Sequence, residues 1–197
     1  GQWVIEEACR QLKTWQTTVA KARHLSMSVN ISSRQFMHND LEQTIQNALE
    51  AVELSPYSFV AELTESAVME KPESVIGQLK RLKKTGIRIA IDDFGTGYSS
   101  LTYLKFLPAN MIKIDQSFVR DMLHDLDDHA IVSGVIGLAA SFHRNVIAEG
   151  VETIEHGSEL INMGCELAQG FGIARPMPTG DIPAWVLEWV PDSNWKT

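Results

Sequence analysis

The sequence has little cysteine, no long apolar run and no excess of positive charge, and each shortage excludes a class of protein. Only Cys9 and Cys165 occur among its 197 residues, too few for a disulfide framework or a CxxC metal site, so we expect buried thiols in a reducing cytoplasm. The longest weakly polar run, 130–142, is shorter than the roughly 20 residues of a membrane-spanning helix, which predicts no membrane contact by this domain. A formal net charge of -8 argues against a nucleic-acid polymer as ligand.

Histidine is scattered as well, without HExxH or similar zinc spacing, so we expect the six histidines to be surface or structural residues. An apolar content of 44% suffices for one sizeable core, and residues 1–197 are therefore predicted to form a single domain. Helical periodicity begins in the first residues, and Gly1 rather than Met opens the sequence. We therefore expect this domain to be incomplete at its N-terminus.

Helical and strand patterns alternate along the chain. Short apolar runs typical of strands occupy 25–30, 59–65, 87–91, 111–115, 145–150 and 165–169, with helical periodicity between them. Strands that alternate with helices form a parallel α/β sheet, whose strands all end at one edge. Six such units leave two architectures open: an open six-stranded sheet, or a TIM-like (β/α)8 barrel whose first strands lie upstream of Gly1.

The most distinctive stretch is 89–100, where an apolar strand leads into Asp92, Asp93 and a glycine turn. Adjacent residues of a strand point to opposite faces, so we expect the strand to end here and free both carboxylates to aim at one point. A cation is the usual reason for such a pair, and two divalent ions held by carboxylates can promote attack on a phosphodiester. The alternative is that both residues simply cap the following helix.

The other predicted strands also end in residues able to bind a metal or a phosphate. These residues are Asn30, Glu62, Lys113 with Asp115, Glu149 and Gln169. Each has an ordinary explanation when taken singly, such as a surface ion pair, an exposed charge or a turn. Six coincident strand ends make these explanations improbable together, so the sequence predicts a polar site at the edge of the sheet.

The segments around these residues resemble, in the same order, those of the EAL-domain family of cyclic-di-GMP phosphodiesterases. They are 28–32 (SVNIS), 34–36 (RQF), 62–66 (ELTES), 92–100 (DDFGTGYSS), 113–115 (KID), 117–119 (SFV), 148–153 (AEGVET) and 169–171 (QGF). The resemblance covers essentially the whole chain and implies a barrel with an antiparallel first strand, here missing its first strands and keeping about six parallel βα units. It implies hydrolysis of cyclic di-GMP (c-di-GMP) to linear pGpG in bacterial signalling.

The resemblance also implies a site for two ions, either Mg2+ or Mn2+. One ion is expected to be held by Asn30, Glu62 and Asp92. The second is expected to be held by Asp92, Asp93 and Glu149, with waters completing about six oxygens per ion. Asp93 and Glu149 thus count among both the metal ligands and the catalytic residues.

The remaining predicted roles concern the lysine and the loops. Lys113 is expected to hold the attacking water and the phosphate charge, with Glu152 and Gln169 as supporting catalytic residues. Glu65 is expected to anchor the loop 93–100. The substrate is expected to contact Arg34 and Asp115.

One departure from the family is large, because the Glu-Ala-Leu tripeptide that names it does not occur in these residues. We expect it upstream of Gly1, where its glutamate would be the missing metal ligand, so that the present residues alone are impaired as an enzyme. The alternative is a degenerate domain that serves as a c-di-GMP receptor or a protein-interaction module. The resemblance further implies a homodimer through the region after Asp93, near 99–106, and upstream GGDEF or sensory domains.

Overall fold

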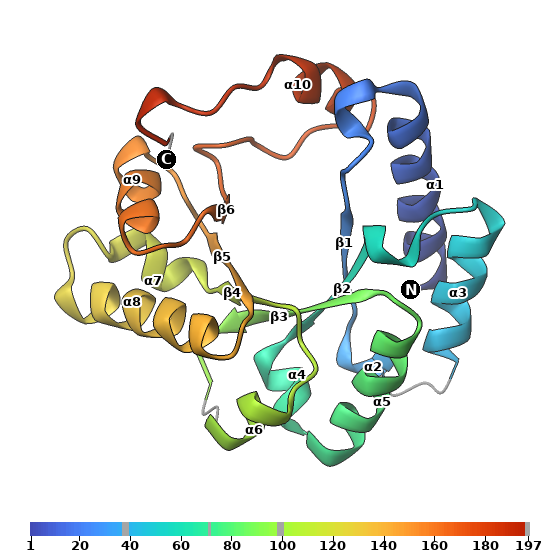
Figure 1. The fold of residues 1–197 in the computed structure, drawn as a ribbon, viewed down its shortest axis with the longest axis horizontal. Coiled ribbons are helices and arrows are strands. Elements are labelled where there is room, and N and C mark those ends of the chain that lie inside the picture. The colour runs from blue at the N-terminus through green and yellow to red at the C-terminus, as the bar shows by residue number, and fades with distance from the viewer. Residues whose placement is uncertain (37–39, 71, 98–100, 196–197) are drawn as a thin grey trace.

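The computed structural model describes residues 1–36, 40–70, 72–97 and 101–195. Within these ranges six strands form one parallel sheet in the order β1-β2-β3-β4-β5-β6 (Figure 1). The strands are β1 (Met27–Asn30), β2 (Phe59–Thr64), β3 (Arg88–Phe94), β4 (Met111–Ile114), β5 (Asn145–Glu149) and β6 (Leu167–Gln169). Each neighbouring pair is also consecutive in sequence, as expected for repeated βα units.

Helices connect the strands. The α-helices in the described ranges are α1 (Gln2–Thr18), α2 (Ser33–Phe36), α3 (Leu41–Ala51), α4 (Glu65–Glu70), α5 (Pro72–Lys84), α6 (Leu101–Phe106), α7 (Gln116–Asp121), α8 (Leu126–Ser141), α9 (Ile154–Asn162) and α10 (Ile182–Glu188). Short 3-10 turns lie at η1 (Ala20–Ala22), η2 (Pro56–Ser58) and η3 (Ser193–Trp195). None of the helices in these ranges is both long and apolar enough to cross a membrane.

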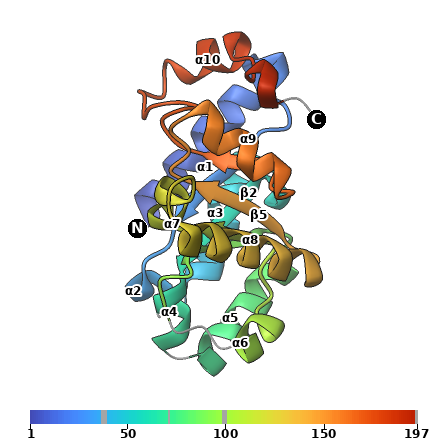
Figure 2. The same cartoon turned by 90° about the vertical axis from the view of Figure 1, so that its left-hand side faces the viewer.

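The sheet curls, with helices on its outer side and the C-terminal segment running between β6 and β1 (Figure 1). Viewed from the side, α8 and α9 lie in front of β5 (Figure 2). At the end of α10, the Leu187 carbonyl accepts a hydrogen bond from Lys21 Nζ, 2.5 Å away, so the C-terminal region contacts η1. The predicted TIM-like α/β architecture with six parallel units is confirmed, in the form of a curled half-barrel.

The two faces of the sheet differ in character because side chains alternate along each strand. The outer face belongs to the main core; its buried residues include Ala61, Leu63, Ile89, Ile91, Ile112, Ile114 and Ala148. On the inner face Val60, Ala90 and Met111 form a smaller apolar cluster, with Ile147 packed against it. Two positions further along the same four strands are Glu62, Asp92, Lys113 and Glu149. The inner face therefore becomes charged toward the carboxyl ends of the strands.

The helical periodicity between the predicted strands coincides with the long helices of the structure. One of them, α8, begins at Leu126, where the Asp125 carboxylate caps it by accepting from the Asp127 and Asp128 amides. Gly164, with φ of 88°, follows the end of α9, in the left-handed conformation that commonly ends a helix. The short helices α2, α4 and α7 have four to six residues, too few for helical periodicity to be visible.

Removing a side chain from the outer face should test this core. Ile112→Ala removes a fully buried side chain of β4 and should lower the free energy of unfolding by about 2–5 kcal/mol through lost burial and a residual cavity. Ile131→Ala on α8, where the side chain is 37% exposed, is the matched control and should change stability much less. Urea unfolding of both variants provides the measurement, and equal losses would contradict the assigned core.

Candidate active site

A bulge in β3 brings Asp92 and Asp93 together. Ile91 pairs with Ile112 and Phe94 with Ile114, so three steps along β3 correspond to two along β4. Asp93 absorbs the extra residue with φ of 54°, a left-handed conformation that is uncommon outside glycine. The prediction that the strand ends at the two acids is wrong, since β3 continues to Phe94. The bulge, instead of a strand end, lets both carboxylates lie on the same side.

Lys113 lies at the centre of the charged end of the inner face. Its ammonium contacts Glu62 Oε2 at 3.0 Å, Asp92 Oδ1 at 3.0 Å and Glu149 Oε1 at 2.7 Å. The Lys113 side chain is only 3% exposed, and an ammonium has three N–H donors. One donor is thus available for each carboxylate, from β2, β3 and β5.

This arrangement shifts the pKa values of its members. Burial alone would lower the pKa of Lys113, but the hydrogen bonds and charges of Glu149 and Glu62 outweigh it and raise that pKa above its ordinary value. Burial raises the pKa of Glu149, and the bond to Lys113 offsets only part of the effect. Burial also raises the pKa of Asp93, with the negative charges of Asp92 and Asp115 adding to it. Lys113 therefore stays charged, whereas its positive charge does not fully offset the effect of burial on the pKa values of Glu149 and Asp93.

Three of the carboxylates could hold a metal ion together. Oxygen atoms of Asp92, Asp93 and Glu149 lie within 4.8 Å of one another, and hard divalent cations prefer such oxygen ligands. The donor set fits a divalent cation, because one ammonium among Glu62 and these three acids leaves the cluster negative overall. Asn30 lies beside Glu62 in the β1–β2 register, at the exposed end of β1.

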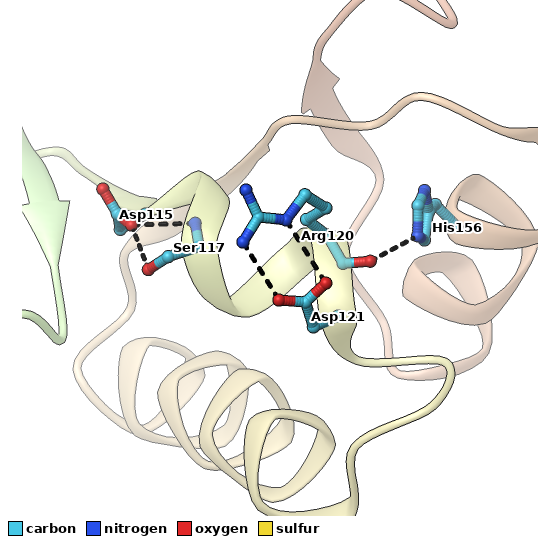
Figure 3. Close-up of polar contacts among 5 residues, drawn as sticks. All are labelled: Asp115, Ser117, Arg120, Asp121 and His156. Atoms are coloured by element: carbon cyan, nitrogen blue, oxygen red, sulfur yellow. Dashed lines mark hydrogen bonds and ion pairs between the residues drawn. The ribbon is translucent and has the colours of Figure 1, made fainter.

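The other residues predicted for the site lie on the strands, loops and helices next to those that carry this cluster. Gln169 pairs with Glu149 in the β5–β6 register but is exposed. Asp115 caps α7, its carboxylate accepting from the Ser117 amide at 2.8 Å (Figure 3). Glu152 and Arg34 have exposed side chains after β5 and on α2. Among the described residues, no hydrogen bond or ion pair joins the side chains of Gln169, Glu152 or Arg34 to the carboxylates around Lys113, so their roles stay predictions.

Glu65 contacts the loop that follows the paired acids. Its carboxylate is 1% exposed, and Oε2 accepts a hydrogen bond from the Gly95 amide at 2.9 Å. Gly97 also packs on this carboxylate, because a Cβ added there would lie 2.6 Å from Glu65 Oε1. This geometry suits an anchor of the loop. Residues 98–100, which belong to the predicted loop and dimer region, lie outside the described residues.

Sequence patterns did not single out His156, which is buried next to the loop after β5. Its ring contacts the backbone amide of Glu152. On the other side the ring contacts the carbonyl of Arg120, on α7 (Figure 3). The available signal was its place three residues after the cap residue Thr153, where the side chain points back toward the preceding loop.

Removing the central positive charge should destabilise the protein when no divalent ion is present. Lys113→Met leaves the carboxylates of β2, β3 and β5 buried without their cation, and we expect a loss of about 3–5 kcal/mol in unfolding free energy. Urea unfolding with a chelator provides the measurement, and added Mn2+ should restore part of the loss by replacing the charge. Lys105→Met, at an exposed lysine of α6, is the control. A Lys113→Met protein as stable as the control would refute the ion-pair cluster.

Comparisons with known proteins identify the family. The family model of the EAL domain matches residues 1–176. The chain is 42% identical over 186 residues to the bifunctional diguanylate cyclase/cyclic di-GMP phosphodiesterase MucR of Pseudomonas aeruginosa, an alignment that covers 94% of this chain and 27% of MucR.

Solved structures agree with this match. The structure of the MucR phosphodiesterase in complex with c-di-GMP superposes with a TM-score of 0.88 at 42% identity, covering 92% of this chain and 73% of that one. The EAL domain of Mycobacterium smegmatis DcpA gives a TM-score of 0.90 at 35% identity, covering 97% and 86% of the two chains. With a family match over nearly its whole length and the same fold as solved members, the chain belongs to the EAL domain family.

Proposed function

We propose that this domain is a phosphodiesterase that hydrolyses c-di-GMP to linear pGpG with two divalent ions, Mg2+ or Mn2+. The observation that carries the proposal is the set of four carboxylates gathered around Lys113 at the carboxyl ends of parallel strands, where barrel enzymes have their active sites. The family match and the activity in the name of MucR support the same substrate.

Each ion would have its own set of ligands. Asp92, Asp93 and Glu149 would hold one, as their spacing suits a single cation. Asn30 and Glu62 would hold the other with Asp92 shared between both, since these residues lie near the carboxyl ends of the adjacent strands β1, β2 and β3. When bound, the ions supply charge that activates water and stabilises the oxygens of the phosphodiester.

The remaining residues would prepare the site for its substrate. Lys113, with its raised pKa, keeps a positive charge that can hold a water and a phosphate oxygen. Glu65 would keep the backbone after Asp93 in place through the Gly95 amide. Arg34 and Asp115 would contact the substrate, and Gln169 and Glu152 would orient water or ligands nearby.

We also propose the setting in which the domain works. The chain spans only 27% of the length of MucR, whose name joins a diguanylate cyclase to the phosphodiesterase. By analogy, GGDEF or sensory domains would accompany this domain in a cytoplasmic protein. A homodimer would form through the region after Asp93, including α6. Residues 1–197 by themselves should hydrolyse c-di-GMP slowly, because β1 and β6 are edges that do not pair with each other in the described sheet.

Loss of one carboxylate should abolish turnover in the full-length protein. Asp93→Asn keeps the shape but removes a charged ligand, and we expect the rate of pGpG formation to fall by on the order of a hundredfold or more. Chromatographic separation of c-di-GMP and pGpG after incubation with Mg2+ or Mn2+ provides the measurement. Asp181→Asn, at an exposed residue before α10 whose side chain caps nothing, should retain the wild-type rate. An Asp93→Asn protein that forms pGpG at the wild-type rate would contradict the proposal.

A c-di-GMP receptor is the second candidate, and the contacts of Lys113 with Glu62, Asp92 and Glu149 favour it, because they already pair these carboxylates with a positive charge that is not a metal ion. In that case the full-length protein would bind c-di-GMP but leave it intact, and the acids around Lys113 would no longer serve catalysis. Equilibrium dialysis of c-di-GMP, run beside the chromatographic assay, separates the two functions. Binding without pGpG would support the receptor.

A further inference from the structure

The imidazole of His156 joins two segments that lie outside its own helix. The residue is 6% exposed in the first turn of α9. Its Nδ1 accepts a hydrogen bond from the Glu152 amide at 3.4 Å, and its Nε2 lies 3.1 Å from the Arg120 carbonyl near the end of α7 (Figure 3). The ring therefore connects the loop after β5 to α7.

The two backbone partners determine which nitrogen carries the proton. An amide N–H only donates, so Nδ1 must present its lone pair to Glu152. A carbonyl oxygen only accepts, so Nε2 must donate a proton to Arg120. Only the neutral ring with its proton on Nε2 satisfies both partners, because an imidazolium would set N–H against N–H at Glu152.

The two joined segments each follow a strand that carries part of the site. α7 follows β4 with Lys113, and the loop 150–153 follows β5 with Glu149; these two side chains form the 2.7 Å contact. The loop also packs on the start of α7, since a Cβ at Gly150 would lie 2.7 Å from the Cβ of Gln116. The loop is thus held against α7 at both of its ends.

Further contacts keep the ring and the loop in place. Trp195 Nε1 donates to the Ile154 carbonyl at 2.9 Å, which holds the first turn of α9 from the C-terminal side. Val151 donates its amide to the Gln169 carbonyl at 3.1 Å, which ties the loop to the end of β6. Trp195 therefore fixes the helix that carries His156, and β6 holds the loop 150–153 that the ring contacts.

We propose that His156 is a positioning residue for the metal centre. Through the Glu152 amide it holds the loop 150–153 against α7, and so keeps Glu149 at the distance from Lys113, Asp92 and Asp93 that a divalent ion requires. The inference rests on the proposed function, because that function supplies the metal ion. The hydrogen bonds by which His156 joins the two segments do not depend on it. A residue that merely fills the core would contribute to stability without affecting the affinity for a divalent ion.

The test compares Mn2+ binding by variants of the full-length protein, measured by titration calorimetry. His156→Ala should weaken Mn2+ binding by about tenfold, the usual size of an effect transmitted through a ligand's supporting contacts. His156→Gln should recover most of this loss, because its amide offers an N–H to Arg120 and a carbonyl to Glu152.

The control and the contrary outcomes follow from the same geometry. His129→Gln is the matched control, since His129, on α8, contacts Glu159 of α9 at 3.0 Å and, within the described residues, makes no side-chain hydrogen bond with the loop 150–153; this variant should bind Mn2+ as the wild type does. Unchanged binding by His156→Ala, or a His156→Gln protein as weak as His156→Ala, would overturn the proposal.

A second measurement covers the case in which His156→Ala does not fold. Nitrogen-15 NMR of the wild-type imidazole at neutral pH should show the neutral form with the proton on Nε2. An Nδ1–H form or an imidazolium would overturn the assigned link. If the wild type binds no Mn2+, the proposed metal chemistry fails, whereas the NMR result still decides whether His156 joins the two segments.

Discussion

One ammonium, that of Lys113, lies among buried carboxylates from three neighbouring strands and links the register of the sheet to the chemistry of the site. Lys113 contacts Glu62, Asp92 and Glu149 from a position that is almost fully buried. Separating these groups would leave charges in an environment that stabilises them poorly. The pairs form only when four strands lie side by side in this register, with their charged residues on the inner face. Fold and site therefore stabilise each other.

The bulge of β3 resolves a conflict between strand geometry and ligand geometry. Consecutive residues of a regular strand face opposite ways, so one of Asp92 and Asp93 would otherwise point into the outer core. The positive φ of Asp93 turns its carboxylate to the inner side, a conformation that persists only when its surroundings hold it. The contact between Glu65 and the Gly95 amide immediately follows the bulge and secures the chain there.

Support for the site extends beyond the strands into the segments that follow them. The loop 150–153 packs on α7, bonds the end of β6 through Val151 and contacts the His156 ring through the Glu152 amide. Such contacts restrict the movement of Glu149, although the residues that make them do not bind a metal ion. The C-terminal segment takes part, since Trp195 holds the helix that carries His156.

The alternation of strands and helices was predictable from the sequence, and with it the parallel α/β sheet with polar residues toward the strand ends. These features depend on periodicity within a few residues, which a sequence displays directly. The bulge through which β3 continues, and the contact of Lys113 with Glu62, 51 residues away in sequence, became apparent only in the folded chain. It also left Gln169 exposed and placed His156 against two backbone segments. The physical reason is that sheet register and packing, which set distances between remote residues, have no signature in local periodicity.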